Sequence, residues 1–314
     1  MDQKIQFVSI IIPCRNEELF IGKCLESIIQ QDFPKENLEV LVIDGSSGDR
    51  TQGIVREFAS KYPFIRLLEN PQKFTPFGLN IGIKASQGEI IIRMDSHAGY
   101  EREYVSKCVK YLRESGADNV GGIIKTLPVK NTLPARAIAK VLSHPFGAGG
   151  SYFRIGSEEP RWVDTVFGGC YKREVFDKIG LFNEKMLRSQ DIELNKRLIK
   201  AGGKILLHPD IVAYYYPQAE FWKFFEHNFT DGFWTIYPLK FKVRFFSWRH
   251  LMPLFFVLTL PLGIWPYIPI SLFFSAKIAL KEDLRYFFIL PFVFFNRHFA
   301  YGLGSLWGMI RLIK

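Results

Sequence analysis

Short apolar runs alternate with stretches of helical periodicity through the first hundred residues, and this alternation restricts the fold more than any other feature. Four runs have the length and composition of buried strands: residues 7–12, 38–43, 64–69 and 89–94. Apolar side chains share one helical face in the segments between them, at residues 18–31, 54–58 and 77–87. This order predicts parallel β-α-β units in an α/β fold, with a mostly parallel sheet and helices on both faces.

Polar clusters follow three of these four runs. They occupy residues 13–17 (PCRNE), 44–47 (DGSS) and 95–97 (DSH). In an open α/β sheet the binding crevice lies beyond the carboxyl ends of the strands, so all three clusters are expected at one edge. Independent turns would not need three polar clusters there, and the sequence therefore favours a binding site over turn residues that happen to be polar.

The pattern becomes mixed beyond Asp95. We expect a helix over about 101–115, a short strand over 119–124, a loop-rich stretch over 127–160 and a strand around 162–167. Residues 189–203 (SQDIELNKRLIKAGG) predict a helix that the final glycine pair ends.

The last third of the chain has a different character. Residues 221–250 mix aromatic side chains with Lys and Arg, which is typical of elements in a membrane interface. Residues 251–274 contain no charge and exceed the roughly 20 residues that cross a bilayer core, although four prolines predict a kinked or re-entrant segment. A second apolar stretch, 286–310, is interrupted by Arg297 and His298. We therefore expect three regions: 1–220, 221–250 and 251–314.

The charge and the cysteines bear on location. The net charge is +10, of which +7 lies beyond residue 220, where 11 Lys and Arg face 4 Asp and Glu. The neighbouring apolar runs favour an anionic membrane over nucleic acid as the partner of this surface. The four scattered cysteines indicate reduced thiols, and the N-terminal apolar run is too short for a signal peptide. We expect a protein of the cell membrane with its first part on the cytoplasmic side.

Motifs in series resemble those of family 2 inverting glycosyltransferases of the GT-A (Rossmann-like) fold. The resemblance covers residues 7–215 and is carried by SIIIPCRNEELFIGKCLESIIQQ, EVLVIDGSSGDRT, FGLNIGIKASQGEIIIRMDSHA, VFGGCYKREVFDKIG and SQDIELNKRLIKAGG. The DSHA form and the tail RHFAYGLGSLWG look most like the membrane-bound succinoglycan-type glycosyltransferases of exopolysaccharide assembly.

The resemblance implies a nucleotide-sugar site. Its expected residues are Pro13, Arg15, Glu17, Asp44, Ser46, Asp95, Gly168 and Gly169. From the residues alone, Asp44 is either a ligand of the ribose or base or a turn carboxylate. The two glycines either let the backbone approach the sugar or make a turn. Asn80 and Gly82 are either helix-packing or donor-contact positions.

The resemblance also implies a divalent cation. Asp95 matches the first carboxylate of the family's Asp-x-Asp motif, which holds Mg²⁺ or Mn²⁺ against the diphosphate. The chain departs from the motif because His97 stands in place of the second Asp. An imidazole can bind Mn²⁺, hydrogen-bond phosphate or serve a structural role. His208 is either a further residue that reaches the metal or one that only satisfies a loop.

Asp191 matches the family's catalytic base, with Gln190 in place of the usual Glu before it. An inverting transfer needs such a base to take the proton of the attacking hydroxyl. The alternative for Asp191 is a carboxylate favoured by the start of a helix. Glu193 and Arg197 are either a helix-face ion pair or, for the arginine, a contact to the diphosphate.

Together these features predict an inverting glycosyltransferase that moves a sugar, for example glucose from UDP-glucose, to a hydroxyl of a lipid-linked glycan. A polyprenyl-phosphate glycosyltransferase is the alternative within the family. A sugar nucleotidyltransferase is less favoured because PCRNEE lacks the glycines of a phosphate loop. A membrane-anchored nucleotide sensor is the non-enzymatic alternative. SWRH stands where processive synthases carry Gln-x-x-Arg-Trp, which favours a single transfer per encounter.

Overall fold

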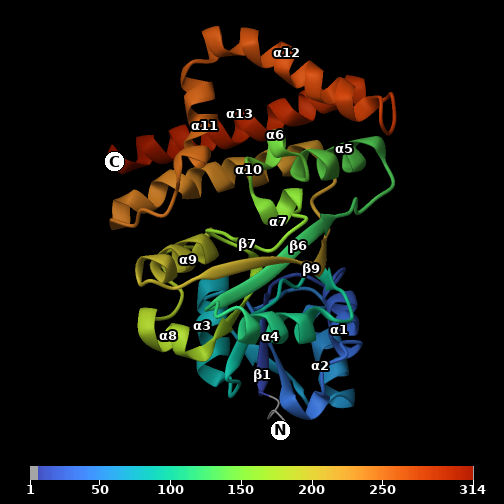
Figure 1. Cartoon of the computed structure of the whole chain (residues 1–314), viewed down its shortest axis with the longest axis vertical. Coiled ribbons are helices and arrows are strands. Elements are labelled where there is room, and N and C mark those ends of the chain that lie inside the picture. Colours follow the sequence, from blue (N-terminus) through green and yellow to red (C-terminus); the bar gives the residue numbers. More distant parts are fainter. Residues whose placement is uncertain (1–5, 314) are drawn as a thin grey trace. The chain divides into compact units, whose positions relative to one another are not determined.

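The computed structural model describes residues 6–313, which form two compact units (Figure 1). One unit contains the residues up to Ile124 together with Gly156–Tyr215. The other contains Lys125–Ile155 and the chain from Tyr216 onward. The expected division into regions 1–220, 221–250 and 251–314 stays a prediction.

The first unit is an α/β unit. Its strands are β1 (Val8–Cys14), β2 (Leu38–Asp44), β3 (Ile65–Glu69), β4 (Ile90–Arg93), β5 (Ala98–Tyr100), β6 (Asn119–Thr126, which ends in the second unit), β7 (Arg161–Trp162), β8 (Phe167–Lys172) and β9 (Ile205–Tyr215). Its helices are α1 (Ile21–Ile29), η1 (Lys35–Asn37), α2 (Thr51–Lys61), α3 (Thr75–Ala85), α4 (Tyr104–Glu114), α8 (Arg173–Ile179) and α9 (Gln190–Lys200).

Within the described residues all nine strands join one sheet, in the order β3-β2-β1-β4-β8-β6-β9-β5, with β7 beside β9. The first four in this order are parallel, as the alternation of runs predicted. β8 then pairs antiparallel with β4 and β6, and β9 antiparallel with β5 and β7. β2 is buried at every position and β1 at all but one, because strands covered by helices on both faces exclude water from both sides.

Two expectations for the middle of the chain are wrong. The stretch 127–160 is not mainly loop, because it contains α5 (Leu133–Leu142), α6 (Pro145–Ala148) and α7 (Tyr152–Ile155). Proline lies in the first turn of α5 and of α6, where a missing N–H leaves no hydrogen bond unmade. The strand expected around 162–167 is instead two strands, β7 and β8, which pair with different neighbours.

The second unit is helical. Besides α5, α6 and α7 it contains α10 (Phe221–Ile236), η2 (Tyr237–Phe241), α11 (Trp248–Leu258), α12 (Leu260–Ala279) and α13 (Tyr286–Ile313). α10 and α13 pack backbone against backbone: a Cβ at Gly232 would lie 1.9 Å from the carbonyl oxygen of Tyr301, and a Cβ at Gly304 would lie 1.9 Å from that of Phe229. These glycines therefore set how closely the two helices approach.

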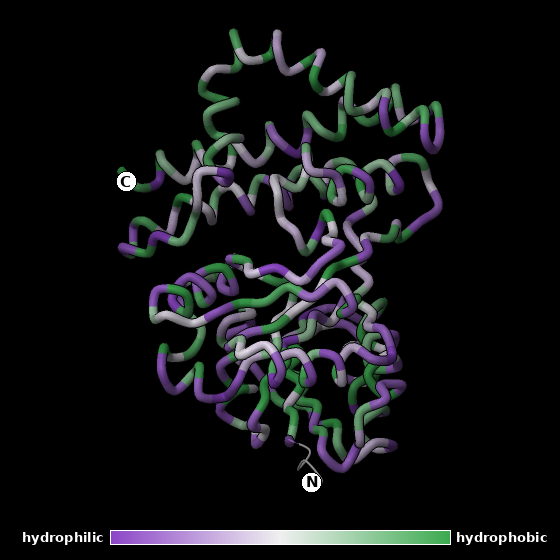
Figure 2. The backbone as a smooth tube through the Cα atoms, in the orientation of Figure 1, coloured by the Kyte–Doolittle hydropathy of each residue, from purple (hydrophilic) through white to green (hydrophobic). Residues whose placement is uncertain are grey.

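The helix α12 is long and apolar enough to cross a membrane, judged by its length and composition, and it is the one such helix in the described part of the chain. Large apolar side chains on it are exposed, among them Leu262 (80%), Trp265 (74%) and Phe273 (62%). Figure 2 shows hydrophobic residues recurring along α12 and α13, with hydrophilic residues gathered in the turn between them.

Candidate functional site

The polar clusters lie at one edge of the sheet, as expected. β1 and β2 are parallel with Cys14 beside Asp44, and β1 and β4 are parallel with Ile11 beside Arg93. The carboxyl ends of these three strands therefore lie at the same edge of the sheet, and the residues of the candidate site follow directly after them.

The Asp44 carboxylate is buried and accepts hydrogen bonds from the turn that follows it. Ser47 donates its backbone N–H to Oδ2 (2.9 Å) and its hydroxyl to Oδ1 (2.5 Å), while Nε2 of Gln52 donates to Oδ2 (2.7 Å). The turn-carboxylate interpretation thus has direct contacts to support it, and a role in nucleotide binding stays a prediction. Ser46 and Arg15 are exposed beside this turn, and Ser46 adopts a positive φ of 56°.

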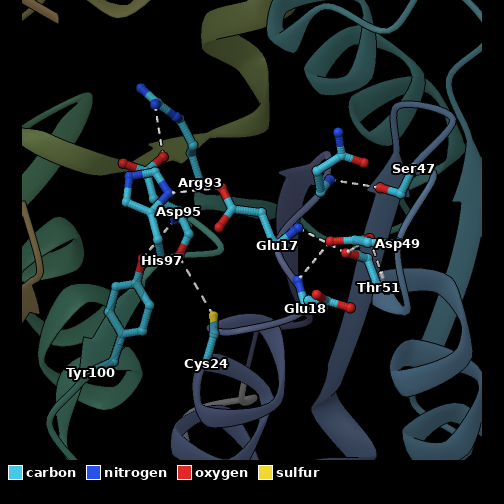
Figure 3. A network of polar contacts seen from close by, with 11 residues as sticks. Glu17, Glu18, Cys24, Ser47, Asp49, Thr51, Arg93, Asp95, His97 and Tyr100 are labelled. Atoms are coloured by element: carbon cyan, nitrogen blue, oxygen red, sulfur yellow. Dashed lines mark hydrogen bonds and ion pairs between the residues drawn. The ribbon is translucent and has the colours of Figure 1, made fainter. Parts of the chain in front are cut away.

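Glu17 connects the turn after β2 with the segment after β4 (Figure 3). Its backbone N–H donates to Oγ1 of Thr51 (2.8 Å), at the start of α2, and its carboxylate Oε1 lies 3.2 Å from Nδ1 of His97. Burial disfavours a charged imidazole, but the hydrogen bond to Glu17 and the charge of Asp95 outweigh it and raise the pKa of His97. The polar clusters are therefore joined by side-chain contacts and do not stand as separate turns.

Asp95 and Asp191 meet on one guanidinium, that of Arg93. Nη2 of Arg93 lies 2.8 Å from Oδ1 of Asp95, and Nη1 lies 3.3 Å from Oδ2 of Asp191. Asp95 follows β4, whereas Asp191 lies in the first turn of α9, where the helix dipole favours a carboxylate. Burial opposes the guanidinium charge, but Asp95 and Asp191 raise the pKa of Arg93. The two carboxylates expected to act on the donor and the acceptor thus lie within reach of a single side chain.

Gly168 and Gly169 are the second and third residues of β8, with φ of +69° and +105°. A Cβ at Gly168 would lie 2.7 Å from the backbone oxygen of Arg93, and one at Gly169 would lie 2.5 Å from the ring of Tyr171. Both positions have a packing reason to be glycine, and a contact with the sugar stays a prediction. Gly82 is likewise a packing position, because its Cβ would lie 2.5 Å from Ile11.

The α9 helix is held by an ion pair on its own face. Nε of Arg197 donates to Oε1 of Glu193 (2.8 Å), and the same guanidinium donates to the backbone oxygens of Ile179 (2.5 Å) and Leu181 (2.7 Å) at the end of α8. The helix-face alternative for Arg197 is confirmed. These contacts anchor the helix that carries Asp191.

His208 lies in β9, where its ring stacks on Tyr111 at 3.5 Å between ring centres and its Nδ1 accepts from the backbone N–H of Asp210 (3.3 Å). The β9 residue that contacts His97 is instead Tyr215, with ring centres 5.8 Å apart. Among the residues that the structure describes, no group of three or more His, Cys, Asp or Glu side chains is placed to hold a metal.

Arg93 and Tyr215 are two residues of the site that were not predicted from the sequence. An arginine at the end of an isoleucine run was the available signal for Arg93, because a buried strand rarely ends in a cation without a partner. For Tyr215 the signal was its place at the end of the strand 205–215, which the expected elements did not include.

Known proteins resemble this chain over most of its length. The model of the family described as Glycosyl transferase family 2 matches residues 9–180. The dolichyl N-acetyl-alpha-D-glucosaminyl phosphate 3-beta-D-2,3-diacetamido-2,3-dideoxy-beta-D-glucuronosyltransferase of Methanococcus voltae is 30% identical over 321 residues, covering 98% of this chain and 98% of that protein. The succinoglycan biosynthesis protein ExoA of Rhizobium meliloti is 28% identical over 273 residues, covering 82% and 81%.

Two solved structures share the fold. The mannosyltransferase PcManGT from Pyrobaculum calidifontis, in complex with GDP-Man and Mn²⁺, superposes with a TM-score of 0.65 at 19% identity, covering 96% of this chain and 87% of that one. TarS of S. aureus, in complex with UDP, superposes with a TM-score of 0.52 at 16% identity, covering 98% and 92%. The expected GT-A fold class is confirmed. The matched family model and the M. voltae relative show that this chain belongs to glycosyltransferase family 2 and is a glycosyltransferase enzyme.

Proposed function

We propose that the chain transfers a hexose, specifically glucose, from a UDP-linked donor to a hydroxyl of a lipid-linked glycan, with inversion at the anomeric carbon. The observation that carries this proposal is the meeting of Asp95 and Asp191 on Arg93. A direct displacement needs two carboxylates close together, one on the donor side and one on the acceptor side. The printed names of the relatives, with a dolichyl-linked acceptor and succinoglycan biosynthesis, support the acceptor class.

Asp191 would act as the general base. As the acceptor oxygen bonds to the anomeric carbon and the bond to the nucleoside diphosphate breaks, Asp191 takes the hydroxyl proton. The contact with Arg93 fixes the direction of this carboxylate. The nucleotide half of the donor would occupy the edge formed by Pro13, Arg15, Glu17, Asp44 and Ser46.

The residues after β4 suit Mg²⁺ or Mn²⁺. A carboxylate and an imidazole, completed by diphosphate oxygens and water, form an ordinary ligand set for such ions. Because Nδ1 of His97 contacts Glu17, its Nε2 would be the ring nitrogen that holds a cation. Bound there, the cation would neutralise charge on the departing diphosphate. The Mn²⁺ in the PcManGT structure supports this choice.

Membrane attachment through the second unit is also part of the proposal, with the first unit on the cytoplasmic side. Exposed apolar residues on α11, α12 and α13 would lie against lipid. Co-sedimentation with anionic vesicles tests this. The double variant Leu262→Glu and Phe273→Glu should reduce binding strongly, whereas Leu19→Glu, equally exposed (76%) but in the first unit, should leave it unchanged. Equal loss in both variants would contradict the attachment surface.

The enzymatic proposal is tested by a donor screen on membranes containing the protein. Release of nucleoside diphosphate is followed with UDP- and GDP-sugars, with and without lipid extract, before and after EDTA and Mn²⁺. Asp191→Asn should lower turnover by about 10²- to 10⁴-fold. Asp177→Asn, an exposed carboxylate of α8, is the matched control and should change nothing.

Preserved turnover in Asp191→Asn would instead support a polyprenyl-phosphate acceptor, whose phosphate is already ionised and needs no base. Release of pyrophosphate would indicate a nucleotidyltransferase. Nucleotide binding without any turnover, across all donors and extracts, would support a sensor.

A further inference from the structure

Arg93 is a buried cation at the end of an apolar strand. The three isoleucines before it in β4 are at most 1% exposed, and Arg93 itself is 9% exposed. A buried guanidinium persists only where carboxylates or other acceptors compensate it. Asp95 and Asp191 supply that compensation, one on each terminal nitrogen.

The charges in this group do not balance. One guanidinium faces two carboxylates, so Arg93, Asp95 and Asp191 together carry a net charge of −1 if all are ionised. Within the described residues, Nε of Arg93 is also buried and has no hydrogen-bond acceptor. The excess carboxylate charge is what a site that accepts a further cation would have. The buried Nε is a donor without an acceptor, so the guanidinium is not held by a complete set of contacts in its present place.

The backbone of Arg93 is held in the sheet, while its side chain connects Asp95 with Asp191. The residue is paired in β4 with Ile11 of β1, and its carbonyl oxygen lies against Gly168, where a Cβ would come within 2.7 Å. A change in pairing must therefore occur at the guanidinium and at the carboxylates and not through movement of the strand.

We propose that Arg93 is a positioning residue that competes with the divalent cation for Asp95 and, once the cation takes that carboxylate, remains paired with Asp191 and holds the base. This inference rests on the proposed function. It assigns Arg93 two separable effects: it weakens cation binding in the absence of donor, and it increases the rate of transfer.

The test measures Mn²⁺ binding to the purified full chain without donor, by the loss of the free-ion EPR signal. Arg93→Gln and Arg93→Met should bind Mn²⁺ roughly five- to tenfold more tightly, as expected when a charge-assisted contact to a ligand is removed. Arg102→Gln, an exposed arginine of the same unit, should bind as the wild type does. Unchanged or weaker Mn²⁺ binding in both Arg93 variants would overturn the inference.

Kinetics supply the second readout. Arg93→Gln should lower kcat by about 10- to 100-fold, because a misplaced base loses the near-attack geometry, while KM for the donor changes less than about threefold. In an Asp191→Asn background the same substitution should have no further effect on the residual kcat, yet it should still tighten Mn²⁺ binding. If Arg93→Gln lowers kcat as much in the Asp191→Asn background as in the wild type, Arg93 does not act by positioning Asp191.

The same set of variants contains controls for loss of activity through misfolding. Arg93→Met leaves two partly buried carboxylates without their cation, whereas Arg93→Gln keeps hydrogen-bond donors there. The double variant Arg93→Met and Asp191→Asn removes one of those charges. Asp95→Asn separates this inference from the proposed function. If Asp95→Asn does not weaken Mn²⁺ binding, the metal assignment itself fails. If it does weaken binding but the Arg93 variants do not tighten it, only the inference fails.

Discussion

The contact between Gly168 and the backbone of Arg93 predicts an unusually large effect of one methyl group. Gly168 has a φ of +69°, and an added Cβ would lie 2.7 Å from the Arg93 oxygen. The left-handed backbone costs an alanine about 1–2 kcal/mol, and forcing β8 away from β4 costs about 1–3 kcal/mol more. Gly168→Ala should therefore lower the free energy of unfolding of the first unit by about 2–5 kcal/mol.

Two other glycines separate these contributions. Gly116 has the same φ of +69° with nothing within 4 Å of its Cβ position, so Gly116→Ala should lose only the backbone part, about 1–2 kcal/mol. Gly53 lies in α2 with open space around it and no positive φ, so Gly53→Ala should stabilise by about 0.5–1 kcal/mol through helix propensity.

Thiol labelling in a urea series measures the first unit without interference from the second. All four cysteines lie in the first unit and are buried. Burial and nearby carboxylates also raise the pKa of the Cys14 and Cys24 thiols, which keeps them unreactive in the folded state. The urea midpoint for labelling then reports the opening of this unit. Equal losses in Gly168→Ala and Gly116→Ala would refute the contact with Arg93.

Three further predictions follow from single contacts. Asn80→Ala removes the hydrogen bonds that join α3 to the backbone of Phe182 in both directions (2.9 and 3.0 Å) and should cost about 2–3 kcal/mol by the same labelling assay. The hydrogen bond from Tyr111 lowers the pKa of Asp210, so its contribution to stability is present above the unfolded pKa and is lost as pH falls through the folded one. Tyr111→Phe should therefore flatten the loss of thermal stability below about pH 4. Gln52→Ala removes one of the two donors to Oδ2 of Asp44 and should lower KM for the donor if Asp44 binds the nucleotide, whereas an unchanged KM would indicate a turn carboxylate.

The parts of the fold that were predictable depend on local periodicity and chain order. Short apolar strands of four to seven residues separated by helices leave few topologies, so β1 to β4 and the edge where they end followed from the sequence. The segment 127–160 was mistaken because proline and glycine signal both loops and helix ends. Pro134 lies in the first turn of α5, and Gly149 ends α6 with a φ of +61°. Only packing decides between these meanings.

The candidate site shows the same limit at the level of single side chains. Chain order places Asp44, Asp95 and Asp191 near strand and helix ends, but it does not say which groups each carboxylate contacts. Asp44 takes partners from its own turn and the helix that follows, and these partners are visible in the segment DGSSGDRTQ. Asp95 and Asp191 share Arg93, a contact between β4 and α9 that arises only when the sheet has folded. A buried cation that joins distant carboxylates is therefore a property of the assembled sheet, and it makes Arg93 a residue that motif patterns centred on the carboxylates alone would overlook.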